Sequence, residues 1–128
     1  MAKKRKRLSP AEIDLMQKLW LLEASTVTEL QNSVNAEREE PVSRNTVQVQ
    51  LQRLEEKGWV EHSANGRVFT FRPTVGAEEG MAELARDFRN KVFGGSSLAM
   101  VRCLVDSGDV TDGEIEELRK LINSRNES

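Results

Sequence analysis

The segment SRNTVQVQLQRLEEKGWV, residues 43–60, constrains the fold most, because two structural patterns compete within it. Residues 47–52 alternate apolar and polar side chains with a period of two, which is typical of a half-buried strand. A helix instead uses both ends of the segment, since Ser43 is a natural N-cap and Gly58 a natural helix end. A strand would leave the helical pattern RLEEKG unexplained. The segment therefore predicts a helix whose buried face carries Val47, Leu51 and Leu54.

On that helix the opposite face is rich in hydrogen-bonding groups. It presents Arg44, Asn45, Gln48, Val49 and Gln52. Amide side chains can pair with adenine, a guanidinium with guanine or a phosphate, and a small apolar side chain with a thymine methyl group. The same face could be an ordinary solvated surface, but an exposed valine contributes little to the stability of a helix. We interpret it as a candidate surface for reading bases in a DNA groove.

Two further helices are expected before this segment. Residues 9–12, SPAE, combine an N-cap, a proline at the first helical position and a capping box, so a helix is expected over residues 10–22. Residues 28–31, TELQ, form a second capping box, which predicts a helix that ends before Pro41. Residues 25–27 are a short β-prone link between the two helices.

A β-hairpin is expected after Gly58. The runs WVEHSA and RVFTFR flank Asn65-Gly66, a dipeptide that suits a type I′ turn because both residues tolerate positive φ. Phe69 and Phe71 are expected to face inward, and Arg67 to lie near the tip. Helix, short strand, helix, helix and hairpin is the order of a winged helix-turn-helix. In such a unit the third helix enters the major groove and the hairpin touches the flanking backbone.

The remainder of the chain predicts helices only. Apolar residues recur at helical spacing over residues 78–93, 97–105 and 111–122, and the last of these begins with the capping box TDGE. Residues 1–75 carry 12 Lys and Arg against 10 Asp and Glu, whereas residues 76–128 carry 7 against 11. The basic start is expected to be a disordered tail. It either contacts the minor groove or phosphates, or only keeps the protein in solution.

The composition argues against several classes of function. The net charge of −2 disfavours a protein that coats nucleic acid without specificity. The one cysteine, Cys103, allows no intrachain disulfide and no cysteine-based metal site, and we expect it to be a buried core residue. The one histidine, His62, lacks a second ligand at metal spacing and is expected to be a polar strand residue. With no catalytic arrangement, phosphate-binding glycine loop, membrane span or signal peptide, we expect a cytoplasmic protein that is not an enzyme and has no cofactor.

The whole chain resembles the penicillinase repressor family, the BlaI/MecI type of bacterial repressors. The resemblance is carried by LSPAEIDLMQKLW near the start, by VTELQNSV and VSRNTVQVQLQRLEEKGWVEH, and by the wing NGRVFTFRP. Many winged helices share LxRLxxKG, but FGGSS and the final GEIEELRKLI make the resemblance more specific. The family's recognition helix usually has Arg and Thr where this chain has Gln48 and Val49, which implies the same reading face with a different operator sequence.

The resemblance implies a mainly α fold with a small β-hairpin. It implies a basic tail (1–8), a winged-helix DNA-binding domain (9–74) and a three-helix dimerisation domain (75–128). The protein would be a transcriptional repressor that binds a dyad-symmetric promoter operator as a homodimer, with residues 43–57 as its recognition helix. The expected DNA-binding residues are Arg44, Asn45, Thr46, Gln48, Val49, Gln52, Arg53 and Arg67. The expected dimerisation residues are Leu84, Phe88, Val92, Leu98, Val101, Leu104, Ile115, Leu118 and Ile122.

The resemblance also bears on regulation. Family repressors of the β-lactam type are inactivated by proteolysis in the dimerisation domain, triggered by a membrane sensor, so a regulatory protease or sensor is implied as a partner. The family's cleaved Asn-Phe bond corresponds to Cys103-Leu104, where the residues differ. The copper-responsive branch has a Cys-rich tail, which the ending NSRNES lacks. The competing interpretation is a non-catalytic winged-helix module that binds other proteins.

Overall fold

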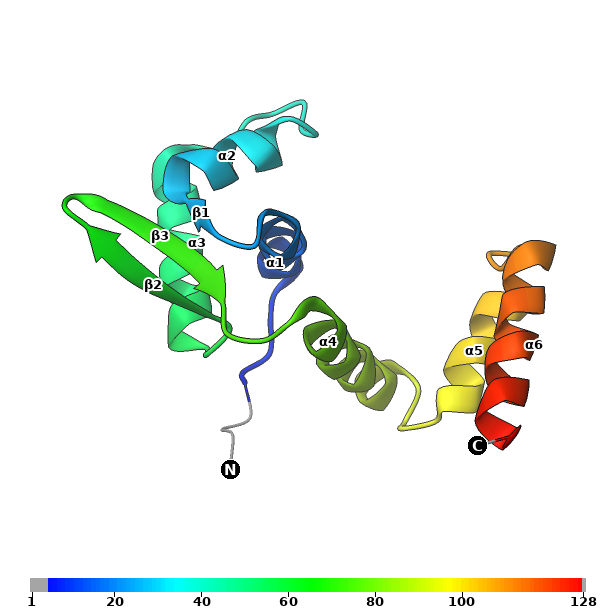
Figure 1. Ribbon diagram of the computed structural model, residues 1–128. Coiled ribbons are helices and arrows are strands. Elements are labelled where there is room, and N and C mark those ends of the chain that lie inside the picture. Colours follow the sequence, from blue (N-terminus) through cyan, green and yellow to red (C-terminus); the bar gives the residue numbers. More distant parts are fainter. Residues whose placement is uncertain (1–4, 128) are drawn as a thin grey trace. The chain divides into compact units, whose positions relative to one another are not determined.

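The computed structural model describes residues 5–127, and within them the chain forms six helices and one three-stranded antiparallel sheet (Figure 1). The expected tail therefore lies partly outside the described residues. The elements in chain order are α1 (Pro10–Leu22), β1 (Ser25–Thr26), α2 (Val27–Asn35), α3 (Arg44–Glu56), β2 (Val60–Asn65), β3 (Val68–Pro73), α4 (Ala77–Val92), α5 (Ser97–Asp106) and α6 (Asp112–Glu127). None of these helices is long and apolar enough to cross a membrane.

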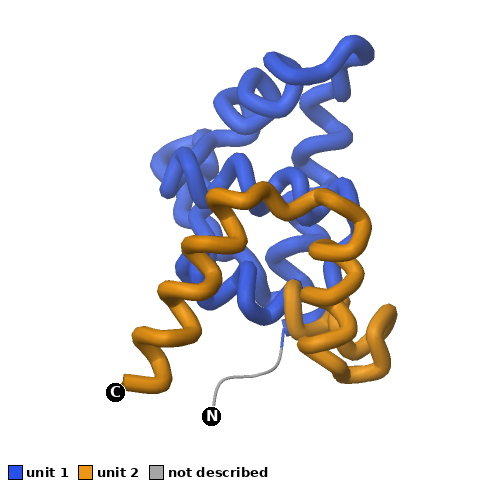
Figure 2. The backbone as a smooth tube through the Cα atoms, turned by 90° about the vertical axis from the view of Figure 1, so that its right-hand side faces the viewer, with its two compact units in different colours: residues 1–84 blue, residues 85–128 orange. Residues whose placement is uncertain are grey.

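The chain packs as two compact units, the first ending at Leu84 and the second beginning at Ala85 (Figure 2). The division falls within α4, further along the chain than the expected boundary after residue 74. The first half of α4 belongs with the winged helix because it packs there. Gly80 lies so close to Trp20 that a Cβ at position 80 would be 2.3 Å from the indole Cζ2. Leu84, half-buried, packs against the core of the first unit.

The core of the first unit joins α1, α2, α3 and the sheet. α1 buries Leu15, Met16 and Leu19, and its half-buried Ile13 and Trp20 pack against the same core. The buried apolar residues are Leu8, Leu15, Met16, Leu19, Val27, Leu30, Val34, Val47, Leu51, Leu54, Trp59, Val60, Phe71 and Val75. The predicted helix over the alternating segment is confirmed, with Ser43 as its N-cap.

The capping box of α2 begins two residues earlier than expected. Thr26, not Thr28, is the N-cap, and its hydroxyl accepts the Glu29 N–H at 3.2 Å while Glu29 accepts the Thr26 N–H at 2.9 Å. Hydrogen bonding of Thr26 to the carboxylate, chiefly from its backbone N–H, holds the pKa of the Glu29 carboxyl below its usual value. The reason is tertiary: Thr26 pairs with Thr70 in the sheet, so the helix begins directly where β1 ends.

The hairpin turn is shifted by one residue from the prediction. Asn65 pairs with Val68, so the two-residue loop is Gly66-Arg67 rather than Asn65-Gly66. Gly66 has φ +65°, as the first loop position of a type II′ turn requires. Phe71 is buried as expected, and Phe69 lies on the same face of β3, but 45% of Phe69 is exposed, so it is not part of the buried core. Phe69 lies nearer the tip of the wing, beyond the reach of the core.

Residues 5–8 are docked on the first unit, whereas a disordered tail was expected over this stretch. We refer to residues 5–8 as the arm. Lys6 N–H donates to the Lys57 carbonyl at 3.1 Å, and the Trp59 indole N–H donates to the Lys6 carbonyl at 2.7 Å. Leu8 is buried in the core. The signal was present in the sequence, because an apolar Leu8 directly before the Ser9 cap is a natural anchor.

The second unit contains the end of α4, then α5 and α6. Ser96 caps α5, and the expected capping box of Thr111 and Glu114 opens α6. All residues of α5 and α6 are described, and none of them is buried within the single chain. The expected burial of Cys103 is therefore wrong for the single chain, where it is exposed.

Candidate nucleic-acid interface

The predicted reading residues of α3 lie on two neighbouring stripes, and two of them, Asn45 and Val49, point away from the core. Val47, Leu51 and Leu54 are fully buried beneath the helix. At 3.6 residues per turn, Asn45 and Val49 then lie on the opposite side. Asn45 is exposed, whereas Val49 is half-buried. Less of the Val49 side chain is therefore accessible than an exposed surface residue would offer.

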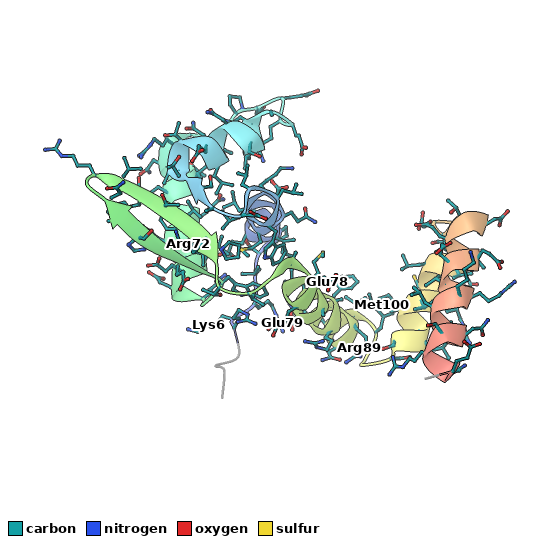
Figure 3. All side chains as sticks on the ribbon, viewed as in Figure 1. Lys6, Arg72, Glu78, Glu79, Arg89 and Met100 are labelled. Carbon is teal, nitrogen blue, oxygen red and sulfur yellow. The ribbon has the colours of Figure 1, made fainter. Side chains whose placement is uncertain are left out.

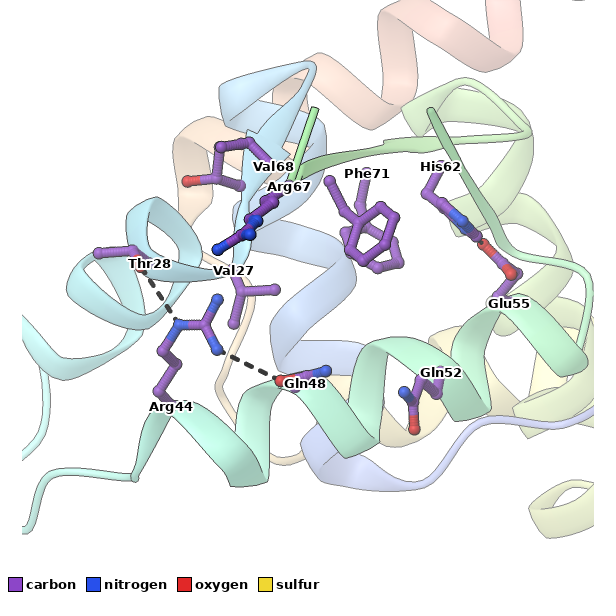
Figure 4. A pocket seen from close by; sticks show the side chains of 12 residues that line it. Val27, Thr28, Arg44, Gln48, Gln52, Glu55, His62, Arg67, Val68 and Phe71 are labelled. Atoms are coloured by element: carbon purple, nitrogen blue, oxygen red, sulfur yellow. Dashed lines mark hydrogen bonds and ion pairs between the residues drawn. The ribbon is translucent and has the colours of Figure 1, made fainter. Parts of the chain in front are cut away.

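A second stripe of α3 faces the wing across a cleft of about 520 Å³ (Figure 4). Arg44, Gln48, Gln52 and Glu55 follow one another on this stripe at spacings of three and four residues. The wing supplies the opposite wall, and the start of α2 closes one end. The lining residues are Thr26, Val27, Thr28, Arg44, Gln48, Gln52, Glu55, His62, Arg67, Val68, Phe69 and Phe71.

Two arginines enter this cleft from different elements. The Arg44 guanidinium donates to Gln48 Oε1 at 3.3 Å and lies 3.5 Å from Thr28 Oγ1, so it is directed along α3 toward the start of α2 (Figure 4). Arg67 comes from the tip of the wing. Two cationic side chains around one cleft favour an anion between them. Thr28 as a partner of Arg44 was not foreseen, because only the tertiary fold brings α2 and α3 together.

The wing is attached to α3 by a contact that the sequence did not indicate. His62 of β2 forms a hydrogen bond through Nδ1 with Glu55 of α3. Its ring also lies 5.2 Å from the Phe69 ring and 5.3 Å from the Phe71 ring, measured between centroids. The expected polar strand residue therefore connects the wing to the last turns of α3. This arrangement positions Arg67 relative to α3.

The remaining predicted DNA-binding residues have different surroundings. Thr46 is exposed, and it takes part in the helix cap, where its N–H and hydroxyl both contact the Ser43 hydroxyl, at 3.0 and 2.9 Å. Arg53 is exposed on the last turn of α3. The structure thus brings Arg44, Gln48, Gln52 and Arg67 together in the cleft and leaves Asn45, Thr46, Val49 and Arg53 outside it.

Among the predicted dimerisation residues, most are exposed in the single chain. Exposed fractions range from 39% for Leu118 to 65% for Leu98. Ile115 is half-buried. Leu84 packs against the core of the first unit, which gives it a role within the single chain. Leu121, with 66% exposed, was not predicted but lies next to Ile122 on α6.

The C-terminal end of α3 is held by an ion pair between the buried Glu12 and the half-buried Lys57. Lys57 Nζ donates to Glu12 Oε1 at 2.6 Å, and the same oxygen accepts the Ser9 N–H at 2.7 Å. Burial raises the pKa of the Glu12 carboxyl, but the hydrogen bonds from Lys57 and Ser9 outweigh burial and leave this pKa below its usual value. In the described part of the chain, no three His, Cys, Asp or Glu side chains gather as a metal site would require.

Comparison with known proteins places the chain in a family. A family model described as Penicillinase repressor matches residues 8–124. The methicillin resistance regulatory protein MecI of Mammaliicoccus sciuri is 25% identical over 125 residues, which are 98% of this chain and 100% of that protein. The penicillinase repressor of Bacillus licheniformis is 26% identical over 120 residues, which are 94% of this chain and 92% of that protein.

A solved structure agrees with the winged-helix part. The monomeric form of Bacillus licheniformis BlaI in complex with the blaP half-operator aligns with a TM-score of 0.50 and 28% identity, covering 61% of this chain and 93% of that chain. The family match, by contrast, extends through α4, α5 and most of α6. Since it spans nearly the whole sequence, this protein belongs to the penicillinase repressor family.

Proposed function

We propose that this protein is a DNA-binding transcriptional repressor that acts as a homodimer on a dyad-symmetric operator. The observation that carries the proposal is the α3 surface, which turns amide and guanidinium groups outward beside a wing that carries Arg67. The solved BlaI relative is bound to a half-operator, which supports the same use of this surface here. Repression would follow because a protein seated on a promoter blocks access of the polymerase.

In this proposal α3 lies in the major groove and the wing follows the DNA backbone. Asn45, Gln48 and Gln52 would pair with base edges, and Val49 would rest against a thymine methyl group. A backbone phosphate would occupy the space between Arg44 and Arg67, where two guanidinium groups line the cleft. Arg53 and Thr46 would contact phosphates at the two ends of α3.

The dimer would form through the second unit. Phe88, Val92, Leu98 and Val101 are among its exposed apolar side chains, and a unit of this size rarely folds without a partner. Residues 85–128 carry 7 Lys and Arg against 8 Asp and Glu, so net charge does not oppose pairing of two copies. A symmetric pair would place two α3 helices about one turn of DNA apart, or a multiple of it.

The test is binding to a duplex that the wild-type protein selects from a random-sequence pool, measured by fluorescence anisotropy at several salt concentrations. Gln48→Ala should weaken binding to the selected duplex by roughly 5-fold to 150-fold, corresponding to about 1–3 kcal/mol for a lost base contact. Arg67→Ala should weaken binding to all sequences alike and lower the salt slope by about 1.

Gln17→Ala is the matched control, because Gln17 is exposed on α1 and outside the cleft. It should bind like the wild type. Loss of affinity in all three variants alike would point to damaged folding rather than lost contacts. Equal, weak binding of the wild type to selected and random duplexes would contradict the repressor and favour the protein-binding module.

A further inference from the structure

We infer that the arm, residues 5–8, is a clasp that fixes the direction of α4 relative to the recognition helix and thereby sets the spacing of operator half-sites. The inference rests on the proposed dimeric function. It gives residues at the start of the chain a positioning role at the point where the winged helix passes into α4.

One end of the clasp is attached to the C-terminal end of α3. Lys6 bonds through its backbone N–H to the carbonyl of Lys57, the C-cap of α3, at 3.1 Å. The Trp59 indole N–H donates back to the Lys6 carbonyl at 2.7 Å, and Trp59 is itself buried. With Leu8 also buried, the arm cannot leave this position without exposing apolar surface.

The other end is attached to α4 through Arg5. Its guanidinium makes a two-pronged contact with the Glu83 carboxylate, of which the Nε–Oε2 distance is 3.1 Å. Glu79, one turn earlier, lies 3.9 Å away, and only 14% of the Arg5 side chain is exposed. The guanidinium carbon is also 5.4 Å from the centre of the Trp59 ring, within range of a cation–π contact. Figure 3 shows Lys6 on the arm and Glu79 on the neighbouring α4.

A second attachment holds the same part of α4 from the side of α1. Gly80 lies against the Trp20 ring, and the Trp20 indole N–H donates to the Val75 carbonyl at 3.0 Å just before α4 begins. Two attachments at different points fix the axis of a helix, whereas one would leave it free to pivot. Both attachments hold the part of α4 that belongs to the first unit, and in this inference that part would direct the chain as it leaves the winged helix.

The contacts of Arg5 separate this role from DNA binding. A guanidinium that is bonded to a carboxylate and covered by the protein offers little to a phosphate. Half-sites rotate about 35° around the DNA axis for each added base pair, so a fixed α4 should tolerate one spacing and penalise its neighbours.

The experiment uses the full chain and the duplex selected by the wild type. A series of duplexes changes the distance between half-sites by one or two base pairs, and a further duplex carries one half-site alone. Wild-type affinity should fall roughly tenfold when the spacing changes. In Arg5→Ala and Glu83→Gln, changing the half-site spacing should lower the affinity by about threefold or less. Their affinity for the single half-site should stay within about twofold of the wild type.

Two variants sharpen the comparison. Lys6→Ala removes a positive charge from the arm but leaves its backbone bonds, so it should keep the wild-type spacing profile. The exchanged pair Arg5→Glu with Glu83→Arg should recover the preference that the single variants lose. Far-ultraviolet circular dichroism and urea midpoints show that each variant is folded.

The clasp is refuted if Arg5→Ala and Glu83→Gln keep the wild-type spacing profile. It is also refuted if Arg5→Ala alone loses single-site affinity with a smaller salt slope, since that result assigns Arg5 to a phosphate. Failure of the proposed function has a different signature. The wild type itself would then bind two half-sites no more tightly than one.

Discussion

Glu12 connects the start of α1 to the end of α3, and it does so with an uneven set of contacts. Its Oε1 receives hydrogen bonds from Lys57 and from the Ser9 N–H, whereas its Oε2 is buried with no hydrogen-bond partner among the described residues. Burial of Oε2 without a partner destabilises the folded state, whereas the hydrogen bonds to Oε1 stabilise the charged form of the carboxyl group. The sequence predicted the capping box with Ser9, but not Lys57, which is distant in the chain and reaches Glu12 only through the fold.

Replacing Glu12 tests this balance. Glu12→Gln should lower the free energy of unfolding by about 1–3 kcal/mol at pH 7, because Lys57 loses a charged partner. The folded-state pKa of Glu12 is below its usual value of 4.5, so its contribution is fully present above that value. The contribution disappears as the pH falls through the folded pKa, and the difference between variant and wild type should shrink with it.

Urea unfolding at a series of pH values between 3 and 7 provides this measurement. Glu39→Gln, at an exposed loop position, should change stability by less than about 0.5 kcal/mol at every pH. A difference between Glu12→Gln and the wild type that stayed constant down to pH 3 would exclude an electrostatic origin.

At the scale of elements, His62 connects the wing to α3, so the two elements form one continuous surface, which is the surface proposed to read DNA. The ring lies between the wing phenylalanines and the Glu55 carboxylate, so the hairpin is supported on one side along its length. The presence of the hairpin was predicted from alternation and a glycine turn. Its exact loop was not, because Asn65-Gly66 and Gly66-Arg67 are both acceptable locally, and strand pairing with Val68 decides between them.

Removing the His62 ring should therefore loosen the wing without unfolding the protein. His62→Ala is expected to weaken DNA binding roughly threefold to tenfold, as the loss of one or two ring contacts implies. The salt slope should fall as in Arg67→Ala, because Arg67 is then no longer held at a fixed position. Anisotropy titrations of the selected duplex at several salt concentrations measure both quantities.

Glu61→Ala is the control for this variant, since neighbouring residues of a strand point to opposite faces. It removes a side chain of similar size from the same strand and should not weaken binding. Unchanged affinity and salt slope in His62→Ala would show that the wing does not need this support.

For the whole molecule, the decisive feature is that the second unit has no buried core of its own. Every described residue of α5 and α6 remains at least partly accessible, although both helices have well-formed caps and apolar faces. Local sequence is therefore sufficient to form these helices and insufficient to bury them. The exposed position of Cys103 has the same cause: its apolar neighbours do not cover it within one chain.

If the protein forms the proposed dimer, a charge on the apolar face of α6 should separate it. Ile122 is 60% exposed, and Ile122→Asp should shift sedimentation equilibrium toward the monomer, because a carboxylate at an apolar interface cannot be desolvated cheaply. Binding to one half-site should persist, while the gain from a second half-site should disappear. Ser124→Asp adds the same charge on the far side of α6 and should remain dimeric. Two variants with equal association constants would argue against this face as the interface.

The sequence alone determined the type and order of the elements in this protein. Caps at Ser9 and Ser43, helical spacing of apolar residues and a glycine turn are local signals. They predicted one outward face of α3 and, separately, Arg67 near the tip of the wing, whereas the fold brought Arg44, Gln48, Gln52 and Arg67 around one cleft. The tertiary structure decided how separate segments meet. It placed the arm on Trp59, the first half of α4 on Trp20, Thr26 at the cap of α2 and His62 against Glu55. These contacts join residues far apart in the chain, and their free energy depends on packing that no local pattern records.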